Sequence, residues 1–265
     1  MARLSEEGRR CVLVCATGGE AGDILNPAMD RPGVRERITE LRREELQAAA
    51  AIIGYDEVVH LGYRDSGMAG SSDNAHSEAF VNAPLSDVLV RVVEIVRRER
   101  PEILFGYDSH ERYPHPDHLR VHELTLGIVE VVADPSWHPE VGPPWRVPLV
   151  VAPAFTARRG LSLHEALERR GLESPLAGRV AGMHRDDDDG DVLVRVMVAG
   201  YMERAREALR AHATQIDPDG RWFAVPLDIA ESVYPYEDFE VLAAQDGAVA
   251  KSGLFEPWPT GPASP

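Results

Sequence analysis

The chain has 265 residues, 44% of them hydrophobic, and a formal net charge of −16 at pH 7. This length suits one large α/β domain with a sizeable core. The acidic balance argues against nucleic acid or an anionic membrane surface as a partner, and no apolar run is long enough to span a bilayer. We expect a cytoplasmic protein with a single domain over residues 1–265, in which the Pro-rich tail from about 256 is flexible.

Hydrophobic periodicity predicts strands and helices that alternate along much of the chain. In chain order, we expect a strand at 11–16, a helix at 34–53, a strand at 57–63, a helix at 86–100, a strand at 103–108, a helix through 119–124, strands at 149–156 and 192–198, and a helix at 203–213. Such alternation is typical of a largely parallel, Rossmann-like sheet flanked by helices, so the predicted fold class is α/β.

Polar residues fall on the first long helix and after the second strand. Arg42 and Glu45 lie three positions apart on the helix 34–53 and can face each other, either as a solvated ion pair or as ligand-binding groups. Asp65 follows the strand 57–63 at its carboxyl end, where an ordinary Asx turn is the alternative to a binding role.

The segment Tyr113-Pro114-His115-Pro116-Asp117-His118 is the most informative stretch of the chain. Its two prolines fix φ and make His115 extended, which predicts a stiff loop. We expect Asp117 to cap the following helix and His118 to lie in its first turn. Because the segment follows the strand 103–108, these side chains are predicted to lie at the carboxyl end of that strand, where open α/β sheets bind ligands.

Two imidazoles and a carboxylate in this order suit the activation of water. Neutral imidazole is a good zinc ligand, a catalytic zinc takes three protein ligands, and a second imidazole can act as an acid or stabilise an oxyanion. The alternative is that His115 and His118 only bind the backbone. His118 and His122 lie at positions i and i+4 of the helix and could bind a metal by themselves. Glu123, however, does not stand where the H-E-x-x-H motif of zinc proteases has its glutamate.

These residues carry a resemblance to a known family. His115-Pro116-Asp117-His118, after Tyr107-Asp108, resembles the second signature of the PIG-L/LmbE family of zinc-dependent de-N-acetylases. Within that family, residues 17–30, 65–67 and 208–215 resemble mycothiol S-conjugate amidase and the deacetylase of mycothiol biosynthesis. The resemblance implies an LmbE-like fold and a zinc ion, with iron as the alternative metal.

The resemblance also implies a role for each candidate residue. His118 would be a metal ligand, and His115 would stabilise the tetrahedral oxyanion or protonate the leaving amine. Asp117 would orient an imidazole, and Tyr113 would lie near the scissile carbonyl. The residues expected to hold the hydroxyls of the substrate are Arg42 and Asp65, with Glu45 beside them.

One departure from the family pattern lies at the start of the chain. The first family signature, Ala-His-Pro-Asp-Asp-Glu, supplies two metal ligands and the general base, and no such hexapeptide occurs in the sequence. Residues 1–10 resemble the helix that normally follows it. We therefore expect the natural protein to begin roughly thirty residues upstream, enough for a strand, the metal loop and part of a helix. On this expectation, residues 1–265 lack the first central strand of the family fold.

The predicted function is zinc-dependent hydrolysis of the amide of an N-acylated glucosamine, in a mycothiol S-conjugate amidase that serves thiol detoxification. One alternative is the de-N-acetylation of N-acetylglucosaminyl-inositol or another N-acetylglucosamine conjugate. A second alternative, for a chain that begins at Met1, is an inactive sugar-binding pseudoenzyme. The expected partner is a small sugar amide, and the sequence leaves the oligomeric state open.

Overall fold

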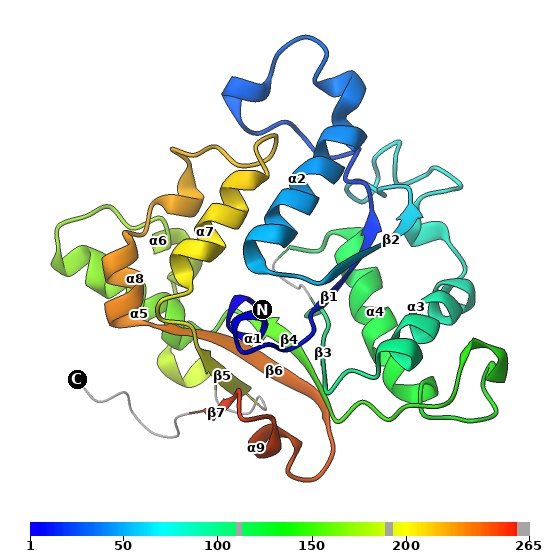
Figure 1. Ribbon diagram of the computed structural model, residues 1–265. Helices are drawn as coiled ribbons and strands as arrows, with labels where there is room; N and C mark the ends of the chain where they lie inside the picture. Colours follow the sequence, from blue (N-terminus) through cyan, green and yellow to red (C-terminus); the bar gives the residue numbers. More distant parts are fainter. Residues whose placement is uncertain (110–112, 189–192, 259–265) are drawn as a thin grey trace. The chain divides into compact units, whose positions relative to one another are not determined.

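The computed structural model describes residues 1–109, 113–188 and 193–258 (Figure 1). The contacts within the chain divide it into two compact units. Unit 1 comprises Met1–Asp65, Thr156–Asp188 and Val198–Tyr236. Unit 2 comprises Ser66–Phe155 and the described parts of Asp189–Met197 and Glu237–Pro265.

Unit 1 contains a two-stranded parallel sheet of β1 (Val12–Thr17) and β2 (Glu57–Tyr63). The strands are connected by α2 (Ile38–Ile53), which ends at Gly54 with φ 94° and the Gly54 N–H bonded to the Ala50 carbonyl. Glycine adopts this left-handed conformation without a steric cost, so the predicted helix end is confirmed. The first turn predicted for this helix is instead a 3₁₀ turn, η2 (Arg35–Arg37).

The longer helices of unit 1 pack in pairs. α7 (Met202–Ala211) contacts α2, and the two lie side by side in Figure 1. α5 (Ala157–Arg169) contacts α8 (Leu227–Val233) through a core of Ala166, Leu167 and Ile229. The shorter elements of unit 1 are α1 (Ala2–Glu6), η1 (Pro27–Met29), α6 (Ala177–Val180), η5 (Arg185–Asp188) and η6 (Arg221–Phe223).

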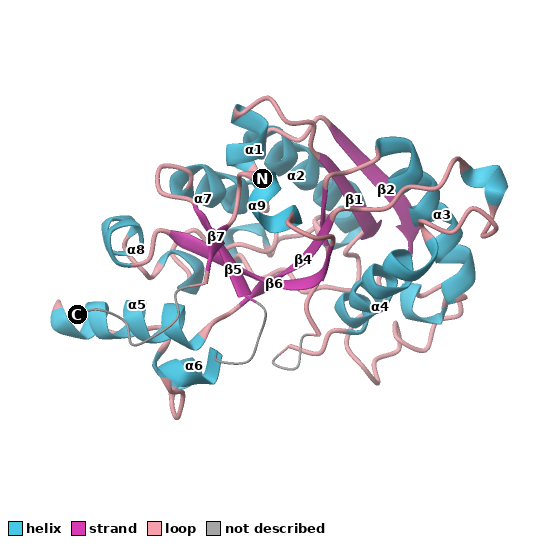
Figure 2. Cartoon of the chain, turned by 90° about the horizontal axis from the view of Figure 1, so that it is seen from below, coloured by secondary structure: helices cyan, strands magenta, loops and turns pink. Residues whose placement is uncertain are grey.

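Unit 2 is built on a five-stranded sheet with the strand order β3-β4-β6-β5-β7, part of which is seen from below in Figure 2. The strands are β3 (Ile103–Phe105), β4 (Leu149–Ala154), β5 (Leu193–Met197), β6 (Tyr236–Ala244) and β7 (Glu256–Pro257). β3 and β4 are parallel, whereas β4–β6 and β5–β7 are antiparallel pairs. The α/β class with helix-flanked sheets is confirmed, and the antiparallel pairs involve β6 and β7, which the sequence analysis did not predict.

Two long helices of unit 2, α3 (Leu85–Glu99) and α4 (Pro116–Val131), pack against each other. Arg97 of α3 is 1% exposed, and its guanidinium donates to the backbone carbonyls of Val131, Val132, Asp134, His138 and Gly142. Hydrogen bonds to a charged donor are strong, so Arg97 fixes the chain that leaves α4. The remaining elements of unit 2 are η3 (Phe80–Asn82), η4 (Pro139–Val141) and α9 (Ala248–Ser252).

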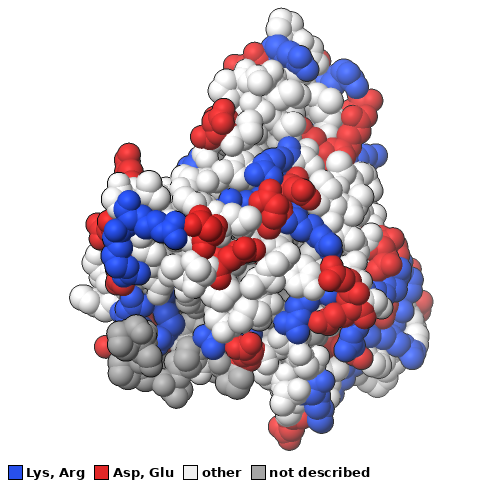
Figure 3. Space-filling view, turned by 60° about the vertical axis from the view of Figure 1, so that its left-hand side comes forward, with Lys and Arg blue, Asp and Glu red and all other residues white. Residues whose placement is uncertain are grey.

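Glu256–Pro257, at the start of the tail that was predicted to be flexible, form β7 and pair with β5. Residues 259–265 of the predicted tail lie outside the described part of the chain. Within that part, no helix combines the length and the apolar character needed to cross a bilayer. On the face shown in Figure 3, acidic and basic side chains are interspersed, so this face has no large patch of one charge sign.

Candidate functional site

The N-terminus of α4 differs from its prediction in one residue. His115, and not Asp117, is the N-cap residue, with φ −70° and ψ 130°, and its Nδ1 accepts a hydrogen bond of 3.2 Å from the Asp117 N–H. Pro116 explains the difference, because proline suits the first helical position and forces the residue before it out of the helical region. Asp117 instead occupies the first turn, where its negative charge interacts favourably with the positive end of the helix dipole.

The cap defines which nitrogen of His115 carries the proton. Neutral imidazole has one N–H donor and one acceptor nitrogen, and Nδ1 is the acceptor here. The proton of neutral His115 is therefore assigned to Nε2. His115 thus presents an N–H donor at the tip of its ring.

Aromatic rings and imidazoles gather around His118, which lies in the first turn of α4 as predicted. Its ring centroid is 4.9 Å from that of His115, 4.8 Å from Tyr107 and 5.6 Å from Tyr113. Tyr113 is 52% exposed and stacks with His115 at 6.1 Å, so it forms the outer wall of the group. Burial raises the pKa of Tyr107, and Asp108 and Tyr113 raise it further, so this phenol stays protonated at neutral pH.

Asp117 is buried and connects α4 to the loop before η3. Its Oδ2 accepts a hydrogen bond of 3.2 Å from the Ser66 N–H, and the Ser66 hydroxyl accepts one of 3.0 Å from the Val81 N–H. These bonds fix the course of the chain after β2 within unit 2. The expected role of Asp117 in orienting an imidazole stays a prediction.

In unit 1, Arg42 lies under the Gly-rich loop that follows β1. Its side chain is almost completely buried, and Nη2 donates to the carbonyls of Gly22 (3.1 Å) and Asp23 (2.9 Å). A Cβ atom at Gly22 would lie 2.6 Å from Nη1, so the loop needs glycine to approach the guanidinium. Burial lowers the pKa of Arg42, and the carboxylates of Asp65 and Glu45 oppose this shift.

Asp65 is held beside this loop by a residue that the sequence analysis did not single out. The Asp65 N–H donates to Glu20 Oε1 at 3.0 Å, and Asp65 Oδ2 accepts from the Ala21 N–H at 3.3 Å. Glu20 Oε2 and the Nε and Nη1 atoms of Arg42 are buried without a hydrogen-bond partner among the described residues. Buried polar atoms without a protein partner are costly, so this group favours a polar ligand. Glu20 lies inside residues 17–30, and the family resemblance of that segment is the signal that could have identified it.

Glu45 has a different set of contacts from the one expected. Its Oε1 accepts from the Thr214 N–H and its Oε2 from the Thr214 hydroxyl, both at 2.7 Å, and Thr214 is fully buried. The Thr214 carbonyl in turn accepts from the Leu25 N–H at 3.0 Å. Glu45 therefore ties α2 to the turn after α7, and its predicted contact with substrate stays a prediction.

The described residues do not fit a zinc ion held by three protein ligands. No group of three or more His, Cys, Asp or Glu side chains among residues 1–109, 113–188 and 193–258 has the geometry to hold a metal. His122, the alternative partner of His118, has its Nδ1 2.8 Å from the Tyr107 carbonyl. A carbonyl only accepts, so this nitrogen carries the proton.

Comparisons with known proteins identify the relatives of the chain. Residues 1–129 match the model of the family PIG-L, described as GlcNAc-PI de-N-acetylase. The chain is 33% identical to 1D-myo-inositol 2-acetamido-2-deoxy-alpha-D-glucopyranoside deacetylase of Streptomyces avermitilis, over 97% of this chain and 90% of the relative. It is 35% identical to mycothiol S-conjugate amidase of Streptomyces coelicolor, over 91% of this chain and 84% of the relative.

A solved structure has the same fold. N,N'-diacetylchitobiose deacetylase from Pyrococcus horikoshii superimposes with a TM-score of 0.60 at 19% identity, over 91% of this chain and 76% of that chain. This agreement confirms the predicted LmbE-like architecture. Together with relatives above 30% identity along nearly their whole length, it shows that the chain belongs to the PIG-L/LmbE family of de-N-acetylases.

Proposed function

We propose that the chain hydrolyses the amide of an N-acylated glucosamine conjugate, with a mycothiol S-conjugate as the preferred substrate. The names of relatives that match over most of their length support this reaction class. The observation that carries the proposal is that Arg42 Nε and Nη1 and Glu20 Oε2 are buried beside Asp65 and offer donors and an acceptor that the described chain does not use.

This group suits a sugar hydroxyl, which donates one hydrogen bond and accepts others. Arg42 supplies guanidinium N–H donors in a fixed fork, and Glu20 supplies a carboxylate acceptor. Asp65 is oriented by its backbone bond to Glu20 and adds a second acceptor. A ring with adjacent hydroxyls would therefore bind here in a single orientation.

His115 is proposed to act on the amide. Water adds to the carbonyl carbon, and the Nε2–H of neutral His115 donates to the oxygen that becomes negative. The C–N bond then breaks, the amine takes a proton, and the products are a carboxylic acid and a free glucosamine amine. The Nδ1 atom of His115 accepts the hydrogen bond from the Asp117 N–H, which favours the neutral tautomer with its proton on Nε2. His115 is therefore better suited to donate a hydrogen bond to the oxyanion than to transfer a proton to the amine.

Zinc, with His118 as one ligand, belongs to the proposal because the family resemblance implies it. It would activate the attacking water. A catalytic zinc takes three protein ligands, and the described residues supply no such group. The roles of His115, Arg42 and Asp65 therefore rest on their own contacts. The same donor set favours a second candidate, a sugar-binding protein without hydrolytic activity.

The proposal is tested with N-acetylglucosaminyl-inositol and a mycothiol S-conjugate, by measuring the free amine released and the zinc content of the purified protein. We expect amine from the S-conjugate at the higher kcat/KM. His115→Asn keeps a good N-cap but loses the imidazole, so kcat should fall by about 10²–10³-fold. Calorimetric binding without amine release, with or without added zinc, would establish the second candidate. Release from neither substrate and no binding would reject both.

A further inference from the structure

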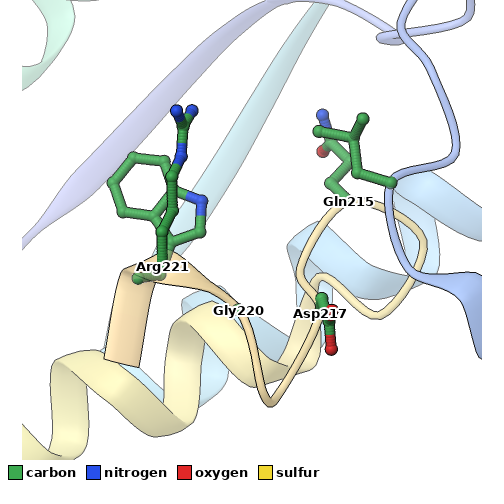
Figure 4. Close-up of a pocket in the computed structure, with 6 residues that line it drawn as sticks. Gln215, Asp217, Gly220 and Arg221 are labelled. Carbon is green, nitrogen blue, oxygen red and sulfur yellow. The ribbon is translucent and has the colours of Figure 1, made fainter. Parts of the chain in front are cut away.

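Unit 1 has a cavity of about 370 Å³ that has no role in the proposed reaction. It is lined by Leu25, Gln215, Asp217, Gly220, Arg221 and Trp222 (Figure 4). Trp222 is 55% exposed and Leu25 is 60% exposed, so two large apolar side chains face solvent in one cavity. Exposed apolar side chains that line a cavity with a few polar groups are typical of small-molecule sites.

Short segments of the chain connect the cavity to the group of Arg42, Glu20 and Asp65. Leu25 lies three residues after Gly22, whose carbonyl binds Arg42. The Leu25 N–H donates to the carbonyl of Thr214, and Gln215 is the next residue. A ligand that is bound at Arg42 and follows this loop would reach the cavity.

The cavity side chains that can contact a ligand favour the binding of a planar apolar ring. Asp217 Oδ1 accepts from the Asp219 N–H at 3.0 Å, and Figure 4 shows Asp217 pointing away from the side on which Gln215 and Arg221 project. The Arg221 guanidinium lies over the Trp222 ring, 5.6 Å from its centroid. An aromatic ring would therefore stack on the part of the exposed indole that Arg221 leaves open.

The turn that carries Trp222 is held against α7 by a neighbouring side chain. Trp222 is the middle residue of η6, and the next residue, Phe223, lies under the Arg210 guanidinium at 4.8 Å. This cation–π contact anchors η6 to α7 while Trp222 faces outward. The indole is thus presented by a fixed turn.

We propose that this cavity is a subsite for a planar apolar group attached to the sugar of the substrate, with Trp222 and Leu25 as its walls. The inference rests on the proposed function for the position of the sugar. It adds aryl glycosides of N-acylglucosamine to the inositol glycosides of the proposed function, and the hydrolytic chemistry does not require this addition. Trp222 and Leu25 would set this specificity without touching the scissile amide.

The test compares calorimetric binding of phenyl and methyl N-acetyl-β-glucosaminide. The intact chain should bind the phenyl glycoside about tenfold more tightly, and Trp222→Ala should remove this preference while the methyl glycoside binds unchanged. Leu25→Ala should reduce the preference, whereas Leu172→Ala, an equally simple truncation of an exposed leucine outside the cavity, should leave it intact. Circular dichroism confirms that each variant is folded.

Four results would overturn the inference. Equal affinity of the intact chain for the two glycosides, or a preference that persists in Trp222→Ala, would reject the cavity assignment while the sugar site and the proposed function stand. Tighter binding of N,N'-diacetylchitobiose than of the phenyl glycoside would show that the cavity takes a second sugar ring. Binding of none of these ligands would reject the sugar site, and this inference with it.

Discussion

Gly22 is the residue through which the loop and Arg42 fit together. Its backbone lies outside the left-handed region, so Gly22→Ala acts by sterics alone, and the new Cβ would lie 2.6 Å from Arg42 Nη1. The guanidinium must then move and weaken its bonds to the Gly22 and Asp23 carbonyls. We expect the affinity for N-acetylglucosamine glycosides to fall about tenfold, at a stability cost of about 1 kcal/mol.

Gly178→Ala is the matched control for Gly22→Ala. A Cβ at Gly178 meets nothing within 4 Å, and the residue lies in α6. Calorimetry should give wild-type sugar affinity for this variant. Unchanged affinity in Gly22→Ala would refute the placement of Arg42 in the sugar site.

The residues of the candidate site were predictable to different degrees. His115, His118 and Asp65 stand in segments that resemble the family, and Arg42 was singled out by its helical spacing from Glu45, so all four were identified before their contacts were known. Glu20 was missed because its bond to Asp65 joins positions 45 apart in the chain, and no local pattern encodes such a contact. The cap on α4 went to His115 because Pro116 outweighs the intrinsic preference for aspartate at that position.

At the scale of elements, Thr214 couples α2 to the turn after α7. Thr214→Val keeps the shape of the side chain but removes the hydroxyl that donates to Glu45 Oε2. A buried carboxylate oxygen then loses its partner, so we expect the free energy of unfolding to fall by about 1–3 kcal/mol in urea denaturation. Thr39→Val, on an exposed position of α2, is the control and should cost far less. Equal losses would show that the Glu45–Thr214 bonds contribute nothing specific.

The start of α5 depends on Asp188. Its Oδ1 accepts from the Ala157 N–H at 2.7 Å and its Oδ2 from the Arg158 N–H at 2.9 Å, so one buried carboxylate satisfies two free donors at the helix N-terminus. Asp188→Ala should lower the free energy of unfolding by about 1–2 kcal/mol, measured by thermal or urea unfolding. Asp186→Ala removes an exposed carboxylate of the same turn and should have little effect. A small effect of both would contradict this role of Asp188.

The predicted elements were those with a clear local period. The strands β1 to β5 and the helices α2, α3 and α7 follow periodic apolar residues, and each was predicted to within a few residues. The existence of α4 was predicted, but this helix extends well beyond the predicted segment 119–124. β6 was missed because its residues show no regular alternation of buried and exposed positions, and its place in the sheet comes from pairing with β4. β7 has only two residues, which is too short for any periodic signal.

At the scale of the whole molecule, the half-buried histidine at the end of α7 makes the free energy of unfolding depend on pH. His212 is the C-terminal cap residue of α7, and its carbonyl accepts from the N–H groups of Gln215 and Ile216 at 2.9 Å. Burial lowers the pKa of His212, Arg42 lowers it further, and Glu45 opposes both effects. The folded state therefore holds this imidazole neutral more strongly than the unfolded chain does.

The sign of the effect follows from the lowered pKa. An unfolded histidine takes up a proton near about pH 6.5, whereas folded His212 does so only at lower pH, so the unfolded state binds more protons between these values. The stabilisation is complete above about pH 6.5 and is lost as the pH falls toward the folded pKa. Urea unfolding at a series of pH values from about 7.5 to 5.5 should give a shallower decline for His212→Gln than for the intact chain. His184→Gln, at an exposed position, should retain the original decline. If the free energy of unfolding falls with pH in parallel for the intact chain and His212→Gln, the folded chain accommodates the protonated imidazole of His212 beside Arg42. The turn that holds Glu45 would then be open to water.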